Sequence, residues 1–200
     1  MRFRLNILLA MMVLVGPSFI AYGRSPAERE LTNVVRLQRN ALHGRDLFDT
    51  CTACHGTSGE GVIDGTVPAI AAQPFKVVAW ALIAFRHGSR QDTRMKHFAD
   101  HHVAGEQDIA DLAIYISRLQ PTPSVQHGTG QQIARGAEVY AGRCASCHGA
   151  KANGNDERRY PRLAGQHYEY LAHQLRDAPN DRWATHADSR LRALHALDPS

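Results

Sequence analysis

The chain has 200 residues, of which 44% are hydrophobic, and a formal net charge of +4 from 23 basic and 19 acidic side chains. The basic residues form no tract of the kind that marks a nucleic-acid-binding surface, so we expect no nucleic-acid partner. The length allows two small domains, each with a core of modest size.

The first 23 residues have the pattern of a cleaved export signal. Arg2 and Arg4 supply the positive start, and the run from Leu5 to Val15 is almost wholly apolar. An uncleaved membrane anchor is the alternative, but this run is short for a span, which needs about 20 residues. No later segment is apolar enough to cross a bilayer. We therefore expect a periplasmic protein without a transmembrane span in its mature form.

A helix is predicted over residues 26–42, ahead of the first cysteine. Its apolar side chains Leu31, Val34, Val35 and Leu42 recur at helical spacing. Packing on the first domain is the simplest role for this segment. Contact with a partner chain is the alternative.

The four cysteines form two C-x-x-C-H motifs, which are Cys51, Cys54 and His55 in the first and Cys144, Cys147 and His148 in the second. This spacing is typical of c-type haem attachment. Two thiols one helical turn apart can each add to a vinyl group of one porphyrin, and the adjacent histidine becomes the proximal iron ligand. The sequence therefore predicts two covalently bound haem c groups.

Other interpretations of the cysteines are weaker. Paired C-x-x-C motifs that share a zinc ion usually lie within about 15–20 residues of each other, whereas these lie 93 residues apart. A thioredoxin-like redox pair requires a βαβ context, and the flanking sequence shows no strand pattern. Disulfides of such tight spacing would close only trivial loops and contribute little stability.

The two motifs belong to an internal repeat with an offset of 93 residues. The matched pairs are His55 and His148, Gly56 and Gly149, Gly61 and Gly154, Pro68 and Pro161, Gln73 and Gln166, and Leu82 and Leu175. Upstream, residues 44–48 resemble residues 136–140 with a shift of one residue. A repeat this close predicts two domains of one fold. We assign residues 24–120 to the first domain with its extra N-terminal helix, 121–132 to a linker, and 133–200 to the second domain.

Each repeat is predicted to be helical. A short helix including Leu47 and Phe48 leads into the first motif, a glycine-rich loop follows each motif, and second helices are predicted over 75–85 and 168–175. The clearest amphipathic pattern runs over residues 108–119, with acidic residues in its first turns. At the same offset its counterpart would begin at position 201. We therefore expect the second domain to be truncated at its C-terminus and to lack this terminal helix.

A low-spin electron-transfer haem also needs a distal ligand, usually Met or His. Met95 is the one methionine after the predicted signal, and we expect it in the loop that precedes the helix at 108–119. We predict Met95 as the distal ligand of the first haem. The neighbouring His97, His101 and His102 are expected to be solvated.

The second haem has no methionine available. Asp188 matches Met95 at the repeat offset and is a poor ligand for this iron. His186 and His195 lie in the right stretch, so bis-His coordination and an open iron both remain candidates. The remaining histidines and the two tryptophans are expected at the surface or in packing contacts; these are His43, His87, His127, His167, His173, Trp80 and Trp183.

These segments resemble the two-haem, two-domain periplasmic cytochromes of the c4 type. The matching text lies at residues 47–56, 108–113, 142–149 and 160–166, and the resemblance covers about residues 44 to 183. It implies an all-α fold of two tandem class I cytochrome c domains, packed face to face with haem propionates near the interface. In class I domains a proline carbonyl accepts the ring N–H of the proximal histidine, which here points to Pro68 and Pro161.

The resemblance also implies a function. It indicates an electron-transfer protein rather than an enzyme, one that delivers electrons to a membrane terminal oxidase or another periplasmic acceptor through transient contacts. The haem subunit of a flavocytochrome c dehydrogenase looks similar and is the first alternative. A ligand-binding or peroxidase-like site at the second haem, with His186 or His195 as acid–base group, is the second.

Overall fold

The computed structural model describes residues 24–121 and 128–177, and this part of the chain is helical. Its elements are α1 (Pro26–Arg36), α2 (Ala41–His55), α3 (Phe75–Arg86), α4 (Thr93–Ala99), α5 (Glu106–Arg118), α6 (Ile133–Val139), η1 (Tyr140–Cys144), α7 (Ala145–His148) and α8 (Tyr168–Asp177). The only β-type pairing in these residues is an isolated bridge between Asn155 and Tyr160. None of the helices described is long and apolar enough to span a membrane.

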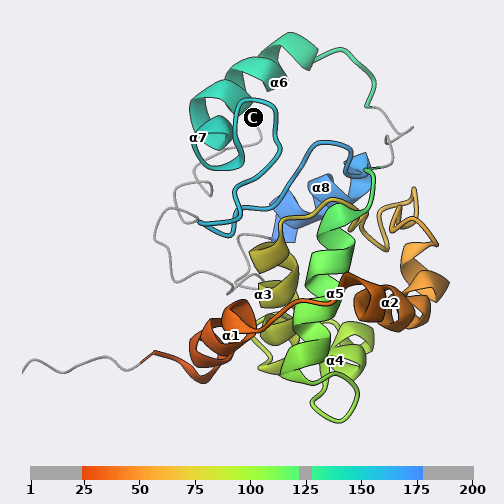
Figure 1. Cartoon of the computed structure of the whole chain (residues 1–200). Helices are drawn as coiled ribbons and strands as arrows, with labels where there is room; N and C mark the ends of the chain where they lie inside the picture. Colours follow the sequence, from red (N-terminus) through yellow and green to blue (C-terminus); the bar gives the residue numbers. More distant parts are fainter. Residues whose placement is uncertain (1–23, 122–127, 178–200) are drawn as a thin grey trace, which may run out of the picture.

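The first domain consists of α1 to α5 around one apolar core (Figure 1). The core forms where α2 and α5 cross, and α3 packs beside them. Gly44 allows this close crossing, since a Cβ at that position would lie 1.9 Å from the carbonyl oxygen of Asp111. Phe48 of α2 packs against Tyr115 of α5 in a tilted arrangement, with ring centroids 5.3 Å apart. The helices predicted over 75–85 and 108–119 are confirmed as α3 and α5.

The helix predicted over residues 26–42 is two helices. α1 ends at Arg36, Leu37 is extended, and the Asn40 side chain caps α2 by accepting hydrogen bonds from two backbone N–H groups. Leu42 therefore belongs to α2, where it is 68% exposed. The prediction was wrong here because the cap at Asn40 interrupts an apolar pattern that otherwise continues.

α1 packs on the first domain, as predicted, against α3 and α5. Its apolar face buries Leu31 and Val34. On the same helix the buried carboxylate of Glu30 pairs with Arg86 and His87 at the end of α3. The buried face of α1 is therefore occupied by contacts within the chain.

The second domain begins with α6, continues through η1 into α7, and ends in the described part with α8. η1 is a π-helical turn, which accommodates one extra residue within a helix. This turn explains the one-residue shift between residues 44–48 and 136–140. The helix predicted over 168–175 is confirmed as α8.

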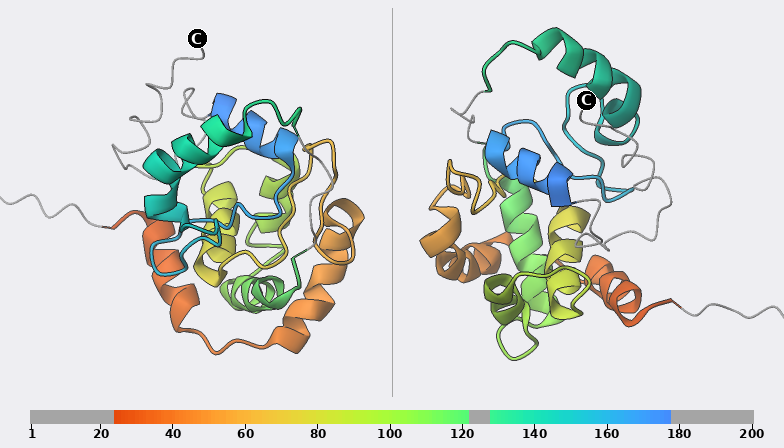
Figure 2. Two further views of the ribbon diagram at one scale, coloured as in Figure 1. Left: turned by 90° about the horizontal axis from the view of Figure 1, so that it is seen from above. Right: turned by 180° about the vertical axis from the view of Figure 1, so that it is seen from behind.

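The two domains pack against each other. In Figure 1 and in the right-hand view of Figure 2, α8 lies between α6 and the helices of the first domain. Ion pairs join their rims. Lys76 Nζ lies 2.6 Å from Glu157 Oε2, and Arg159 lies 2.9 Å from Glu28 of α1. The extra N-terminal helix thus contacts both domains.

Candidate haem centres and the interface between them

The first motif occupies the C-terminal end of α2. Cys51 and Cys54 lie one turn apart on this helix, and His55 is its last residue and only 7% exposed. The His55 Nδ1 lies 3.0 Å from the carbonyl oxygen of Pro68, to which it donates. Burial lowers the pKa of His55, which favours the neutral ring. With Nδ1 held by the carbonyl, Nε2 keeps its lone pair for a metal.

The second motif repeats this arrangement. His148 ends α7, and its Nδ1 lies 2.9 Å from the carbonyl oxygen of Pro161. The resemblance implied a proline carbonyl as the partner of each histidine, and the structure confirms both bonds.

The loop that presents each proline is also repeated. The Gly61 N–H donates to the carbonyl of His55 at 2.8 Å, and the Gly154 N–H donates to the carbonyl of His148 at 2.9 Å. A Cβ on either glycine would come within 2.7 Å of the backbone of the matching proline. Glycine is therefore required here so that the loop can fold closely under the histidine.

All four cysteines are unpaired thiols. Burial, followed by the neighbouring Cys54, raises the pKa of Cys51 to about 11. Within the described ranges no three or more His, Cys, Asp or Glu side chains are grouped to hold a metal ion. The two cysteine pairs therefore do not share a zinc site, and each pair stands beside its own histidine.

Met95 lies in α4 rather than in the loop expected from the sequence. The helix forms because Asp92 accepts hydrogen bonds from the N–H groups of Arg94 and Met95. Burial has the largest effect on the pKa of His55, and the Pro68 carbonyl has the next largest. The charge of Arg94 also lowers this pKa, and the charge of Asp92 raises it. Met95 itself is half-buried in the first turn of α4.

His97, His101 and His102 are exposed, as expected. The candidates for the second distal ligand, His186 and His195, lie outside the described residues, as do Asp188, His127 and Trp183.

Three histidines treated as surface or packing residues make specific contacts. The ring of His43 lies 2.9 Å from the buried carboxylate of Asp111, whose hydrogen bond raises the pKa of His43. His87 pairs with Glu30. His167 is buried, and its Nε2 donates to the carbonyl of Glu60 across the domain interface at 2.7 Å. Sequence reasoning missed these partners because they come from distant parts of the chain.

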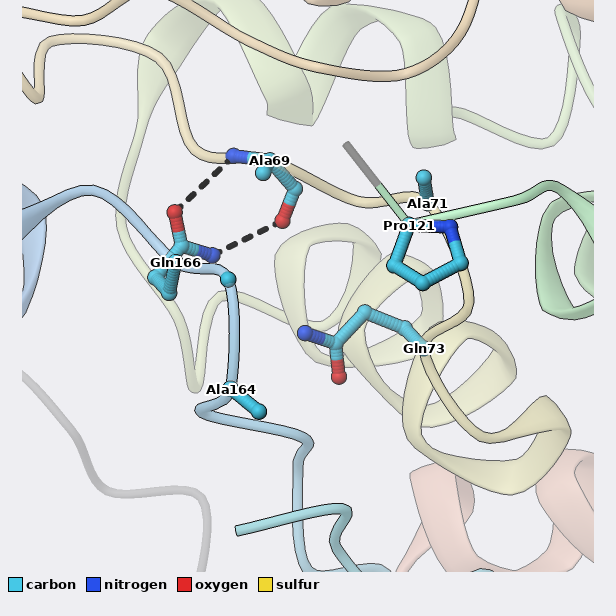
Figure 3. A pocket seen from close by; sticks show the side chains of 7 residues that line it. Ala69, Ala71, Gln73, Pro121, Ala164 and Gln166 are labelled. Atoms are coloured by element: carbon cyan, nitrogen blue, oxygen red, sulfur yellow. Dashed lines mark hydrogen bonds between the residues drawn. The ribbon is translucent and has the colours of Figure 1, made fainter. Parts of the chain in front are cut away.

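Two glutamines join the domains through their side-chain amides. Gln166 bonds both backbone groups of Ala69, and Gln73 bonds both backbone groups of Arg162. Between them lies a small cavity walled by both domains (Figure 3), lined by Ala69, Ala71, Gln73, Pro121, Ala164, Gly165 and Gln166. The repeat had matched Gln73 with Gln166, but nothing in the sequence indicated that each would reach into the other domain.

The family model for cytochrome c matches residues 41–120 and 133–196, which is most of the chain in two consecutive copies. The chain belongs to the cytochrome c family. Cytochrome c domains of this type hold haem through C-x-x-C-H, and the four cysteines of this cytochrome fit the attachment positions. The cytochrome therefore carries two covalently bound haem c groups.

Individual relatives agree with the two-domain plan. Cytochrome c4 from Azotobacter vinelandii is 28% identical over 162 residues, covering 74% of this chain and 76% of the relative. A thiosulfate dehydrogenase electron acceptor from Thiomonas intermedia is 29% identical over 136 residues, covering 64% of this chain and 61% of the relative. The crystal structure of reduced cytochrome c4 from Pseudomonas stutzeri superposes with a TM-score of 0.72 at 24% identity, covering 80% of this chain and 92% of that structure. The expected all-α fold of two cytochrome c domains is thereby confirmed, and the cytochrome is c4-like and transfers electrons.

Proposed function

We propose that this cytochrome is exported to the periplasm and carries single electrons from respiratory donors to a membrane terminal oxidase or another acceptor. A haem c in each domain supplies the one-electron Fe(III)/Fe(II) couple. The observation that carries the proposal is the repeated geometry of two histidines, each held through Nδ1 by a proline carbonyl beside a pair of free thiols. This arrangement prepares Nε2 to bind iron.

We assign the proximal iron ligands to His55 and His148, and the distal ligand of the first haem to Met95. The bond from Nδ1 to the proline carbonyl fixes the tautomer and the plane of each ring. Burial of His55 disfavours its protonation, so the nitrogen facing the metal is not lost to a proton near neutral pH. The Asp92 cap fixes the first turn of α4 and thereby the place of Met95.

A direct test follows the reoxidation of the purified, fully reduced protein after mixing with membranes that contain a terminal oxidase. We expect both haems to be reoxidised much faster than by oxygen alone, with oxygen uptake that needs the membranes. A Cys144→Ala/Cys147→Ala variant, which loses the second attachment, controls for the number of electrons delivered. Reoxidation no faster with membranes than without them would refute the oxidase as acceptor.

A second candidate is the haem subunit of a larger dehydrogenase. It is favoured by the similarity to a protein described as a thiosulfate dehydrogenase electron acceptor. In this case the cytochrome should co-purify with a second chain from its native host and be reduced by that chain's substrate. Isolation as a single polypeptide, together with rapid transfer to oxidase membranes, would favour the carrier instead.

A further inference from the structure

The domain interface contains two hydrogen-bonded rings of the same design. The Gln166 Oε1 accepts from the N–H of Ala69 at 3.0 Å, and its Nε2 donates to the Ala69 carbonyl at 2.8 Å. On the other side, the Gln73 Oε1 accepts from the N–H of Arg162 at 3.0 Å, and its Nε2 donates to the Arg162 carbonyl at 2.8 Å. A primary amide has one acceptor and one donor edge, so it can pair with both backbone groups of one residue.

The repeat offset of 93 residues converts one ring into the other, because it maps Gln73 onto Gln166 and Ala69 onto Arg162. The interface is therefore self-complementary in the manner of a two-fold dimer. Each domain supplies one glutamine amide and one backbone residue that pairs with the glutamine of the other domain. Figure 3 shows one of these rings, with the Gln166 amide facing both backbone groups of Ala69. The two glutamines thus share one role.

Each ring ends on the peptide group that also holds a haem-motif histidine. The carbonyl of Pro68 and the N–H of Ala69 belong to one planar peptide unit. Its carbonyl accepts from His55, and its N–H donates to Gln166 of the other domain. The peptide unit between Pro161 and Arg162 likewise accepts from His148 and donates to Gln73.

Hydrogen bonds in such a chain polarise one another. A peptide whose N–H is engaged by a glutamine oxygen is a stronger acceptor at its carbonyl. The stronger bond to Nδ1–H then makes the imidazole a more basic ligand and holds its ring plane. The chain from glutamine through peptide to histidine crosses the interface in both directions.

We propose that Gln166 is a positioning residue for His55 and that Gln73 is a positioning residue for His148, so that each domain adjusts the proximal ligand of the other. This inference rests on the proposed iron ligation by the two histidines. It assigns to the domain contact a chemical effect on each haem in addition to holding the domains together.

The test is a redox titration of the full-length holoprotein with Gln166→Met and Gln73→Met, which keep the side-chain length and remove both hydrogen bonds. Paramagnetic proton NMR follows the axial-ligand signals of each haem, assigned through contacts with its own domain. We expect Gln166→Met to raise the potential of the first haem and move its histidine signals, with the second haem unchanged. Gln73→Met should instead raise the potential of the second haem and leave the first unchanged. In both variants the potential rises because a less basic imidazole stabilises Fe(III) less.

Glu157→Gln is the matched control. This substitution removes the interdomain ion pair between Glu157 and Lys76. The Glu157 side chain is 81% exposed and contacts neither of the two peptide units that hold His55 and His148. We expect no shift at either haem. Shifts in the haem of the glutamine's own domain, equal shifts in both haems, the same shift in the control, or no shift at all would each overturn the proposal. The readout needs no redox partner, so failure to react with oxidase membranes would leave it intact.

Discussion

The position of Met95 depends on the side chains next to it in the sequence. Asp92 caps a short helix where the sequence predicted a loop, and the charges of Asp92 and Arg94 at the start of that helix act on the pKa of His55. A thioether is a soft ligand that favours Fe(II) and so raises a haem potential. Arg94 and Asp92 pair with each other, and their charges shift the pKa of His55 in opposite directions.

We predict that Met95→Ala abolishes the long-wavelength charge-transfer band of Met–Fe(III) ligation and lowers the potential of the first haem. The second haem should keep its spectrum and potential. Absorbance spectra of the oxidised protein and a redox titration provide the measurement. Survival of the band in the variant would show that Met95 is not the ligand.

At the scale of elements, α2 and α6 are repeat counterparts with different surroundings. Gly44 of α2 lies against the backbone of α5, whereas the matching Gly136 of α6 has nothing within 4 Å in the described part of the chain. None of the described residues of α6 is buried, and its Ile133 is 73% exposed. The same helix sequence pattern is thus packed in one domain and open in the other.

Substitution of each glycine by alanine measures this difference. Gly44→Ala should destabilise the first domain by at least about 2 kcal/mol, since the added methyl group overlaps the Asp111 carbonyl. Gly136→Ala should instead stabilise the second domain by about 0.5–1 kcal/mol through helix propensity. Denaturant unfolding followed at each haem provides both values. If Gly136→Ala were strongly destabilising, a segment outside the described residues would have to pack on α6.

For the whole molecule, the distribution of buried apolar residues is uneven. In the described part of the chain, all the buried apolar residues lie between Ala27 and Ile116, within the first domain. α8 and the Gln166 contacts hold the second domain against this core. The described part of the second domain thus contributes none of the buried apolar side chains in these residues, whereas the first domain has a continuous apolar core.

We predict that the second domain unfolds first on heating. Its haem should lose its native absorbance at a lower temperature than the first, and Gln73→Met/Gln166→Met should widen the gap by weakening the interface. Thermal unfolding monitored at bands specific to each haem is the measurement. A second haem that outlasts the first would contradict this expectation.

Sequence patterns alone determined the cofactor, the attachment residues, the two-domain repeat and the positions of α3, α5 and α8, because spacing along one chain encodes local geometry. The helix break at Asn40 and the helix around Met95 were missed, since each depends on a side-chain cap that competes with an apolar or loop-like pattern. Only the tertiary structure decided what Gln73, Gln166 and His167 contact. Their partners lie about ninety or more residues away in the chain, in the other domain. A repeat shows that two residues correspond, but it does not show that the side chain of each one binds the other domain.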